Sequence, residues 1–112
     1  MTAQETTKAK TDVPLLLSKK LIVLNRIGLH LRPAALLVRI ASAFDAEIYI
    51  ESGCRKASAK SILSILALEV GSGKEVRVTA EGHDAHEAIY KIECFFARGL
   101  REEGSQVKGV TT

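Results

Sequence analysis

A histidine and an arginine lie two positions apart where a helix is predicted to begin. The stretch GLHLRP (residues 28–33) follows a short apolar segment and precedes an apolar, alanine-rich run. Because Pro33 lacks the backbone N–H that a first helical turn leaves unpaired, we expect the helix to begin close to His30. The free N–H groups of Leu31 and Arg32 should then point out of the helix end toward the imidazole.

This predicted helix end is suited to phosphoryl chemistry. A phosphoryl group on a ring nitrogen of His30 would meet the free N–H donors, the positive end of the helix dipole and the Arg32 guanidinium. Attack on phosphorus requires an uncharged ring nitrogen, and the positive helix end favours that form, whereas arginine keeps its charge. The alternative is that His30 only caps the helix while Arg32 reaches solvent, which is the commoner situation for a lone histidine at a helix start.

Ser61 lies at the start of a second predicted helix, because it precedes the apolar run ILSILALEV. Serine is a preferred N-cap residue, and this structural role explains Ser61 by itself. A phosphate on its hydroxyl would add a charge of about −1.5 to −2 and would repel an acidic partner docked nearby. From these residues we expect Ser61 to serve as an N-cap.

Composition limits the classes of protein that fit. The chain has 112 residues, 46% hydrophobic and 4% aromatic, with a formal charge of +3. These values fit one domain with an aliphatic core, and they lack both the basic excess and the aromatic platforms of a nucleic-acid binder. No segment approaches the roughly twenty apolar residues of a membrane span. We expect a cytoplasmic monomer without membrane insertion.

Metal and cofactor sites are not indicated. Cys54 and Cys94 lie forty positions apart without a zinc-type spacing, and we expect both to be reduced thiols. His83 and His86 could share a helical face, but a third ligand is not apparent and a solvated first turn explains them more simply. The sequence therefore predicts neither a metal site nor a cofactor.

The elements that must position these residues follow from hydrophobic periodicity. Apolar alternation predicts strands, and apolar residues at helical intervals predict helices, with Asp84 and Glu87 spaced as a capping box. The expected order is a strand over 19–25, a helix over 31–44, strands over 46–52 and 55–59, a helix from 61 to 71, a strand over 74–82 and a helix from 84 to 99. This β-α-β-β-α-β-α order predicts an α+β fold, a four-stranded antiparallel sheet with three helices on one face. Residues 1–17 and 101–112 are expected to be a flexible extension and a flexible tail around a domain over 18–100.

A docking surface is expected around the two candidate sites. Apolar side chains on the two helices could form a shared contact area with a basic rim, for which the alternative is ordinary core packing. Within this surface we expect Leu66 to belong partly to the core and Leu36 and Ile62 to be more exposed. The predicted docking residues are Leu31, Ala35, Leu36, Arg39, Ile62 and Leu66.

Two stretches resemble the HPr family, the histidine-containing phosphocarriers of the sugar phosphotransferase system. The first is GLHLRPAA (28–35), which resembles the active-site signature, and the second is ASAKSILSILALEVGSGKEV (57–76). The resemblance implies an open-faced β-sandwich and a stoichiometric carrier rather than an enzyme. It also implies that His30 carries phosphate on Nδ1 from Enzyme I to Enzyme IIA proteins. Ser61 would then be a regulatory phosphorylation site for HPr kinase/phosphorylase as well as an N-cap. Leu31 and Leu36 depart from the family, which more often has Ala or Thr at the first position and a polar residue at the second.

A second class of function remains as the alternative. A noncatalytic α+β module could bind RNA or a regulatory protein through a basic face. Labelling with Enzyme I and phosphoenolpyruvate separates the two, because only the carrier gives acid-labile phosphate on His30.

Overall fold

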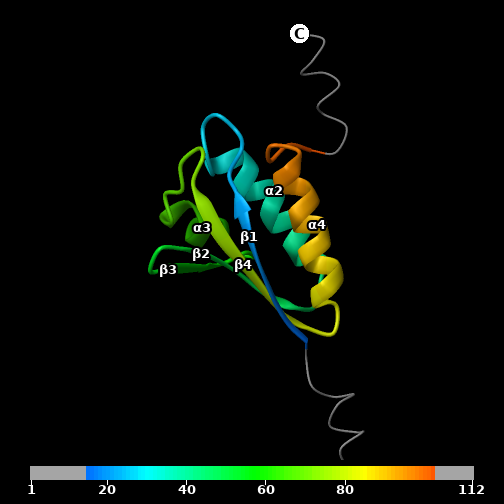
Figure 1. Ribbon diagram of the computed structural model, residues 1–112. Helices are drawn as coiled ribbons and strands as arrows, with labels where there is room; N and C mark the ends of the chain where they lie inside the picture. Colours follow the sequence, from blue (N-terminus) through cyan, green and yellow to red (C-terminus); the bar gives the residue numbers. More distant parts are fainter. Residues whose placement is uncertain (1–14, 103–112) are drawn as a thin grey trace, which may run out of the picture.

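The computed structural model describes residues 15–102, which form seven elements (Figure 1). Most of the predicted extension and tail, residues 1–14 and 103–112, lies outside the described residues. In chain order the elements are β1 (Leu15–Ile22), α2 (Leu31–Ser42), β2 (Glu47–Ser52), β3 (Arg55–Ser58), α3 (Ile62–Ala67), β4 (Glu75–Gly82) and α4 (Ala85–Ala97). This order confirms the predicted β-α-β-β-α-β-α succession.

The four strands form one antiparallel sheet in the order β1-β4-β2-β3. Along β4, Val76, Val78 and Ala80 are buried, whereas Glu75 and Arg77 are exposed. Such alternation is expected of a sheet that is covered on one face. Figure 1 shows α2 and α4 side by side against the sheet, and the predicted open-faced β-sandwich is confirmed.

The core lies between the sheet and the helices and is mainly aliphatic. Phe95 and Phe96 are its only buried aromatic side chains among residues 15–102, in an edge-to-face contact with centroids 6.2 Å apart. The largest fully buried side chains are Phe95, Phe96, Leu37, Ile48, Ile50, Ile65, Ile92, Val23, Val76 and Val78. Both long helices thus present an apolar stripe to the sheet, as the helical periodicity predicted.

The first strand differs from its prediction at both ends. β1 begins at Leu15, so residues 15–17 are part of the sheet and not of a flexible extension. They are held because Leu15 pairs with Gly82 at the far end of β4. The strand ends at Ile22, opposite the first residue of β4, because β4 offers no further pairing.

The helix predicted from 61 to 71 is shorter than expected. α3 ends at Ala67, and Glu69 adopts a left-handed φ of 54°. A helix cannot continue through that conformation, and the N–H groups of Leu68 and Glu69 instead donate to Ile65 and Leu66, respectively. Apolar spacing alone does not reveal this turn.

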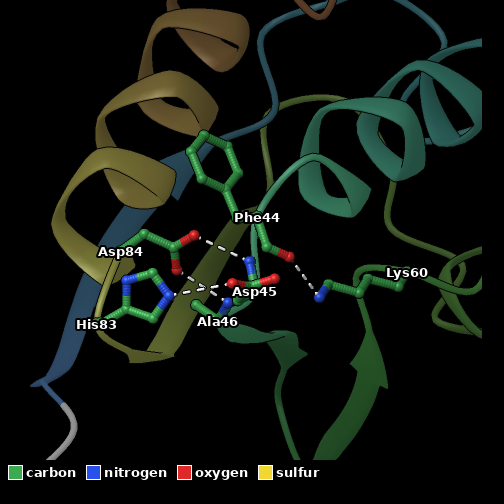
Figure 2. A network of polar contacts seen from close by, with 6 residues as sticks. All are labelled: Phe44, Asp45, Ala46, Lys60, His83 and Asp84. Atoms are coloured by element: carbon green, nitrogen blue, oxygen red, sulfur yellow. Dashed lines mark hydrogen bonds and ion pairs between the residues drawn. The ribbon is translucent and has the colours of Figure 1, made fainter.

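The capping box predicted at Asp84 is wrong. The Asp84 side chain makes no cap hydrogen bond, and its two carboxylate oxygens accept the backbone N–H groups of Asp45 and Ala46, each at 2.9 Å (Figure 2). His83 Nε2 lies 3.1 Å from Asp45 Oδ2, and Lys60 Nζ donates to the Phe44 carbonyl at 2.8 Å. Asp84 therefore joins the loop after α2 to the turn before α4.

This junction shifts two ionisation equilibria. The hydrogen bond to Asp45, aided by the Asp84 charge, raises the pKa of His83. Desolvation acts to raise the pKa of Asp84, but the backbone hydrogen bonds from Asp45 and Ala46 and the His83 charge together lower it. Both charged forms are thus favoured in the folded chain.

Within residues 15–102, no helix combines the length and the apolar character needed to cross a membrane.

Candidate functional site

The loop before α2 is fixed by Asn25 and Gly28. Asn25 Nδ2 donates to the Gly28 carbonyl at 2.9 Å, and the Gly28 N–H donates back to Asn25 Oδ1 at 3.0 Å. Gly28 has a φ of 92°, and a Cβ there would lie 2.6 Å from the Val70 carbonyl oxygen. The next residue, Leu29, donates its N–H to that same carbonyl at 2.9 Å. The loop that leads to His30 therefore packs against the segment that follows α3. The sequence analysis did not identify Asn25 as the residue whose side chain fixes this loop.

His30 is the N-cap residue of α2, as predicted. Its carbonyl accepts the Ala34 N–H at 3.0 Å, and its own N–H donates to Gly28 at 3.0 Å. Its side chain makes no cap hydrogen bond, and His30 as a whole residue is half-buried. The imidazole therefore does not consume the N–H groups of Leu31 and Arg32, and helix geometry leaves both without an intrahelical acceptor.

Pro33 fixes the first turn of this helix. It is the third residue of α2 and is buried, in a position where its missing N–H removes no helical hydrogen bond. The apolar stripe that follows, Ala34, Leu37 and Ala41, is also buried. Packing of its buried face thus holds the first turns of α2, while the backbone N–H groups at the N-terminus of the helix stay available to a ligand.

His30 and Arg32 line one cavity of about 460 Å³. The cavity lies between the start of α2 and the segment that follows α4, which Figure 1 shows beside each other. Its other lining residues are Leu24, Asn25, Arg26, Pro33, Gly99, Leu100, Arg101 and Glu102. The structure therefore brings the two predicted phosphate-handling side chains to one concave site with room for a phosphoryl group.

Arg32 is exposed and faces an acidic residue that sequence reasoning missed. Arg32 Nη2 lies 3.7 Å from Glu102 Oε1, and Arg39 Nη1 lies 3.9 Å from Glu102 Oε2. Glu102 follows the predicted domain end and falls in the stretch assigned to a flexible tail. No local sequence signal links it to α2, because the contact depends on how α4 ends.

Ser61 caps α3 in the predicted way. Its backbone is extended, with a φ of −127°, and its hydroxyl oxygen accepts the Ser64 N–H at 3.3 Å. Ser61 is partly buried. The hydroxyl that would receive a phosphate is therefore already engaged with its own helix.

The predicted docking residues differ in exposure. Leu31 is 62% exposed and Arg39 is exposed, while Ala35 is partly buried. Leu36, Ile62 and Leu66 are all partly buried and pack against the core. Leu66 thus belongs partly to the core as expected, and the greater exposure expected of Leu36 and Ile62 stays a prediction.

Other apolar side chains are more exposed than these. Leu63 is 79% exposed on α3, Ile27 is 70% exposed in the loop before His30, and Leu24 is 58% exposed at the cavity. Sequence reasoning missed all three as docking candidates. The available signal was that Leu63 falls between Ile62 and Ile65, off the buried face of the helix.

His83 lies in a cluster with Asp45 and Asp84, whose potential ligand atoms are within 4.8 Å of one another. The hydrogen bonds of Asp84 to the backbone of Asp45 and Ala46 give this cluster a structural role at the junction. Cys54 and Cys94 are free thiols.

Comparisons with known proteins agree with this geometry. A family model described as "PTS HPr component phosphorylation site" matches residues 17–98. The chain is 41% identical over 85 residues to Phosphocarrier protein HPr of Treponema pallidum (strain Nichols), which covers 76% of this chain and 97% of that protein. It is 45% identical over 76 residues to Phosphocarrier protein NPr of Shewanella violacea, covering 68% of this chain and 84% of that protein. The crystal structure of HPr-C-His from Thermoanaerobacter tengcongensis superposes with a TM-score of 0.74 at 38% identity, over 77% of this chain and 97% of that one.

Proposed function

Because the chain belongs to the PTS-HPr family, whose members carry phosphoryl groups stoichiometrically and are not catalytic enzymes, we propose that His30 is its phosphoryl acceptor. In the proposed step the lone pair of a ring nitrogen, Nδ1 by the family resemblance, attacks phosphorus on the donor. A new N–P bond forms while the donor's bond to phosphorus breaks, and the bonding pair returns to the donor. The reverse step passes the group on to the next protein.

One observation carries this proposal: His30 is the N-cap residue of α2, yet its side chain makes no cap hydrogen bond. The ring sits beside two N–H donors at the positive end of a helix, where an anion is stabilised. Arg32 lines the same cavity and would add a charge-assisted hydrogen bond to the phosphoryl oxygens. Phosphoryl transfer needs mainly positioning and charge stabilisation, which this arrangement provides without a metal or cofactor.

The proposed partners are Enzyme I as donor and Enzyme IIA proteins or domains as acceptors, with the chain acting as a cytoplasmic monomer. Support for a docking surface comes from the exposed apolar side chain of Leu31 and from the exposed cation of Arg39, on the same helix as His30. Apolar area with a basic rim suits brief contacts with acidic proteins. We extend this surface to Leu63 and Ile27, which are the most exposed large apolar residues among 15–102.

Ser61 is the proposed regulatory site, phosphorylated by an HPr kinase/phosphorylase. Its hydroxyl already accepts the Ser64 N–H, so a phosphate would replace a neutral cap with a charged one. The helix would keep its cap, while an acidic partner approaching α3 would meet new negative charge. Replacing Ser61 by Asp should therefore weaken docking of Enzyme I more than it weakens the fold.

The decisive experiment is incubation with Enzyme I and phosphoenolpyruvate, followed by intact mass measurement before and after acid treatment. We expect one acid-labile phosphoryl group on the chain, lost in His30→Ala and kept in Ser61→Ala. An unlabelled wild-type chain would contradict the proposal. Salt-sensitive RNA binding that His30→Ala leaves unchanged would instead favour the noncatalytic module.

A further inference from the structure

Arg26 lines the same cavity as His30 and Arg32, although it comes from a different element. It belongs to the loop between β1 and α2, which Figure 1 shows at the same end of the molecule as the start of α2. The stretch that resembles the family signature begins at Gly28, so Arg26 lies outside it. The cavity therefore contains a cation to which neither the motif nor the resemblance gives a role.

The backbone of this loop is fixed on both sides of Arg26. Before it, the buried Val23 donates its N–H to the turn that precedes β4, at 2.9 Å. After it, the Gly28 carbonyl accepts both the side-chain amide of Asn25, at 2.9 Å, and the His30 N–H, at 3.0 Å. One carbonyl thus ties the turn that carries Arg26 to the backbone of the proposed phosphoryl acceptor.

The side chain of Arg26, by contrast, is available to a ligand. Within residues 15–102 it forms no hydrogen bond or ion pair, and the residue is exposed. All of its N–H donors can therefore be offered to an acceptor in the cavity. The charged residues of the lining favour an anion, because cations outnumber carboxylates among them: Arg26, Arg32, Arg101 and Glu102.

A second guanidinium suits the chemistry proposed for His30. During phosphoryl transfer the negative charge spreads over the three equatorial oxygens of the moving group, whereas one guanidinium fork binds two oxygens. The free N–H groups of α2 and the Arg32 side chain approach from the helix, and Arg26 extends from the loop. Arginine stays protonated near neutral pH, so Arg26 can supply charge and hydrogen bonds without competing as a base.

We propose that Arg26 is a second phosphoryl-binding arginine, which donates hydrogen bonds to the oxygens of the phosphoryl group as this group moves to and from His30. The inference rests on the proposed role of His30. The N–P bond forms and the donor's bond to phosphorus breaks as in that step, while Arg26 keeps all of its protons. Its contribution is greatest while the group is in transfer, because the charge on the oxygens is then shared between donor and acceptor.

The test compares Arg26→Gln and Arg26→Lys with wild type, using Lys74→Gln as a control that removes one positive charge from an exposed residue outside the cavity lining. Each chain is loaded by Enzyme I and, separately, by phosphoramidate, a small phosphoryl donor that brings no protein surface with it. We expect Arg26→Gln to load about 3- to 10-fold more slowly with either donor. Arg26→Lys should recover part of this loss, because it keeps the charge but not the planar fork. Lys74→Gln should load as wild type.

A folding defect is not expected to explain the slower loading. The Arg26 side chain has no protein partner within the described residues, so Arg26→Gln should unfold at the same temperature as wild type. A direct readout is the Nε–H signal of Arg26 in nuclear magnetic resonance spectra. This signal should shift, and its exchange with water should slow, when His30 of the wild-type chain is phosphorylated.

The outcomes separate the two proposals. Wild-type chain that neither donor labels on His30 would overturn the phosphocarrier proposal itself. Labelling of His30 by phosphoramidate at equal rates in Arg26→Gln and wild type would overturn only the role of Arg26. A loss confined to Enzyme I would overturn that role too, because it would place Arg26 at the protein interface instead of at the phosphoryl group. An Nε–H signal that phosphorylation leaves unchanged would contradict it in the same way.

Discussion

The helices α2 and α3 start in opposite ways. At α2 the N-cap side chain, His30, makes no cap hydrogen bond, whereas at α3 the Ser61 hydroxyl accepts the Ser64 N–H. Both residues were predicted to carry phosphate. The first helix thus leaves its N–H donors available to a ligand, and the second satisfies its own.

Length and packing explain why the two helices tolerate different starts. α2 has 12 residues and buries four side chains, so tertiary contacts hold it without a cap. α3 has six residues, of which only Ile65 is buried. A short helix with little buried surface depends on its cap, whereas a long packed one can leave its end free for chemistry.

The largest expected effect tests the open helix end. Arg32→Ala should slow phosphorylation of His30 by about 10- to 100-fold, because the helix N–H donors remain while the guanidinium is lost. The fold should be unaffected, since the Arg32 side chain is 76% exposed. Single-turnover transfer from Enzyme I measures the rate, and Arg77→Ala on the sheet serves as the control. Wild-type rates for Arg32→Ala would remove this residue from the site.

The next test separates two effects at Gly28, the close contact of this loop with Val70 and the positive φ of Gly28 itself. Gly28→Ala should destabilise the chain by roughly 2 kcal/mol or more, because a Cβ would clash with Val70 at a positive φ. Gly53→Ala is the matched control, since Gly53 also has a positive φ but a Cβ there would have no atom within 4 Å. Urea denaturation should show the larger loss for Gly28→Ala, together with slower loading of His30. Equal losses would show that the contact with the segment after α3 is unimportant.

Removing the N-cap side chain of either helix should have a smaller effect on the free energy of unfolding. Ser61→Ala should cost about 1 kcal/mol of the free energy of unfolding, because the Ser64 N–H loses its acceptor. His30→Ala should change stability by less than about half of that, because no cap hydrogen bond is lost. Thermal or urea unfolding of the two variants measures both values. A reversed order would refute the distinction between an open and a self-capped start.

The smallest effect concerns the junction at the other end of α2. The raised pKa of His83 means that its stabilising contribution is present below the unfolded value of about 6.5 and is lost as pH rises through the folded value. The lowered pKa of Asp84 means that its contribution is present above about 3.9 and is lost as pH falls through the folded value. Melting temperatures measured against pH should fall above the folded pKa of His83 and below the folded pKa of Asp84. His83→Gln should flatten the alkaline side and leave the loading rate unchanged; a slower loading would link this junction to the site.

Most of the fold could be predicted because local signals agree with one another. The alternation of Val76, Val78 and Ala80 identified a half-buried strand, and Ser61 before an apolar run identified a helix start. The features that were missed depend on distant partners. Asp84 has the spacing of a cap but binds Asp45 and Ala46, nearly forty residues away.

The same distinction holds at the site. His30, Arg32 and Pro33 share one short motif, and the structure places them as expected at the start of α2. Glu102 could not be found in this way, because its place beside Arg32 depends on the left-handed turn at Leu100 that ends α4. The exposure of Leu63 similarly depends on which face of a six-residue helix meets α2.

The position of β1 in the sheet affects when the chain can complete its fold. Leu15 pairs with Gly82 and Ile22 with Glu75, so the first strand must wait for nearly the whole domain before it finds a partner. Contacts between such distant residues slow folding, and an unpaired strand bearing Leu15 and Leu16 is open to pairing with other chains. During synthesis on the ribosome, the sheet closes only after β4 has emerged, and that interval is when a nascent chain is most exposed to aggregation.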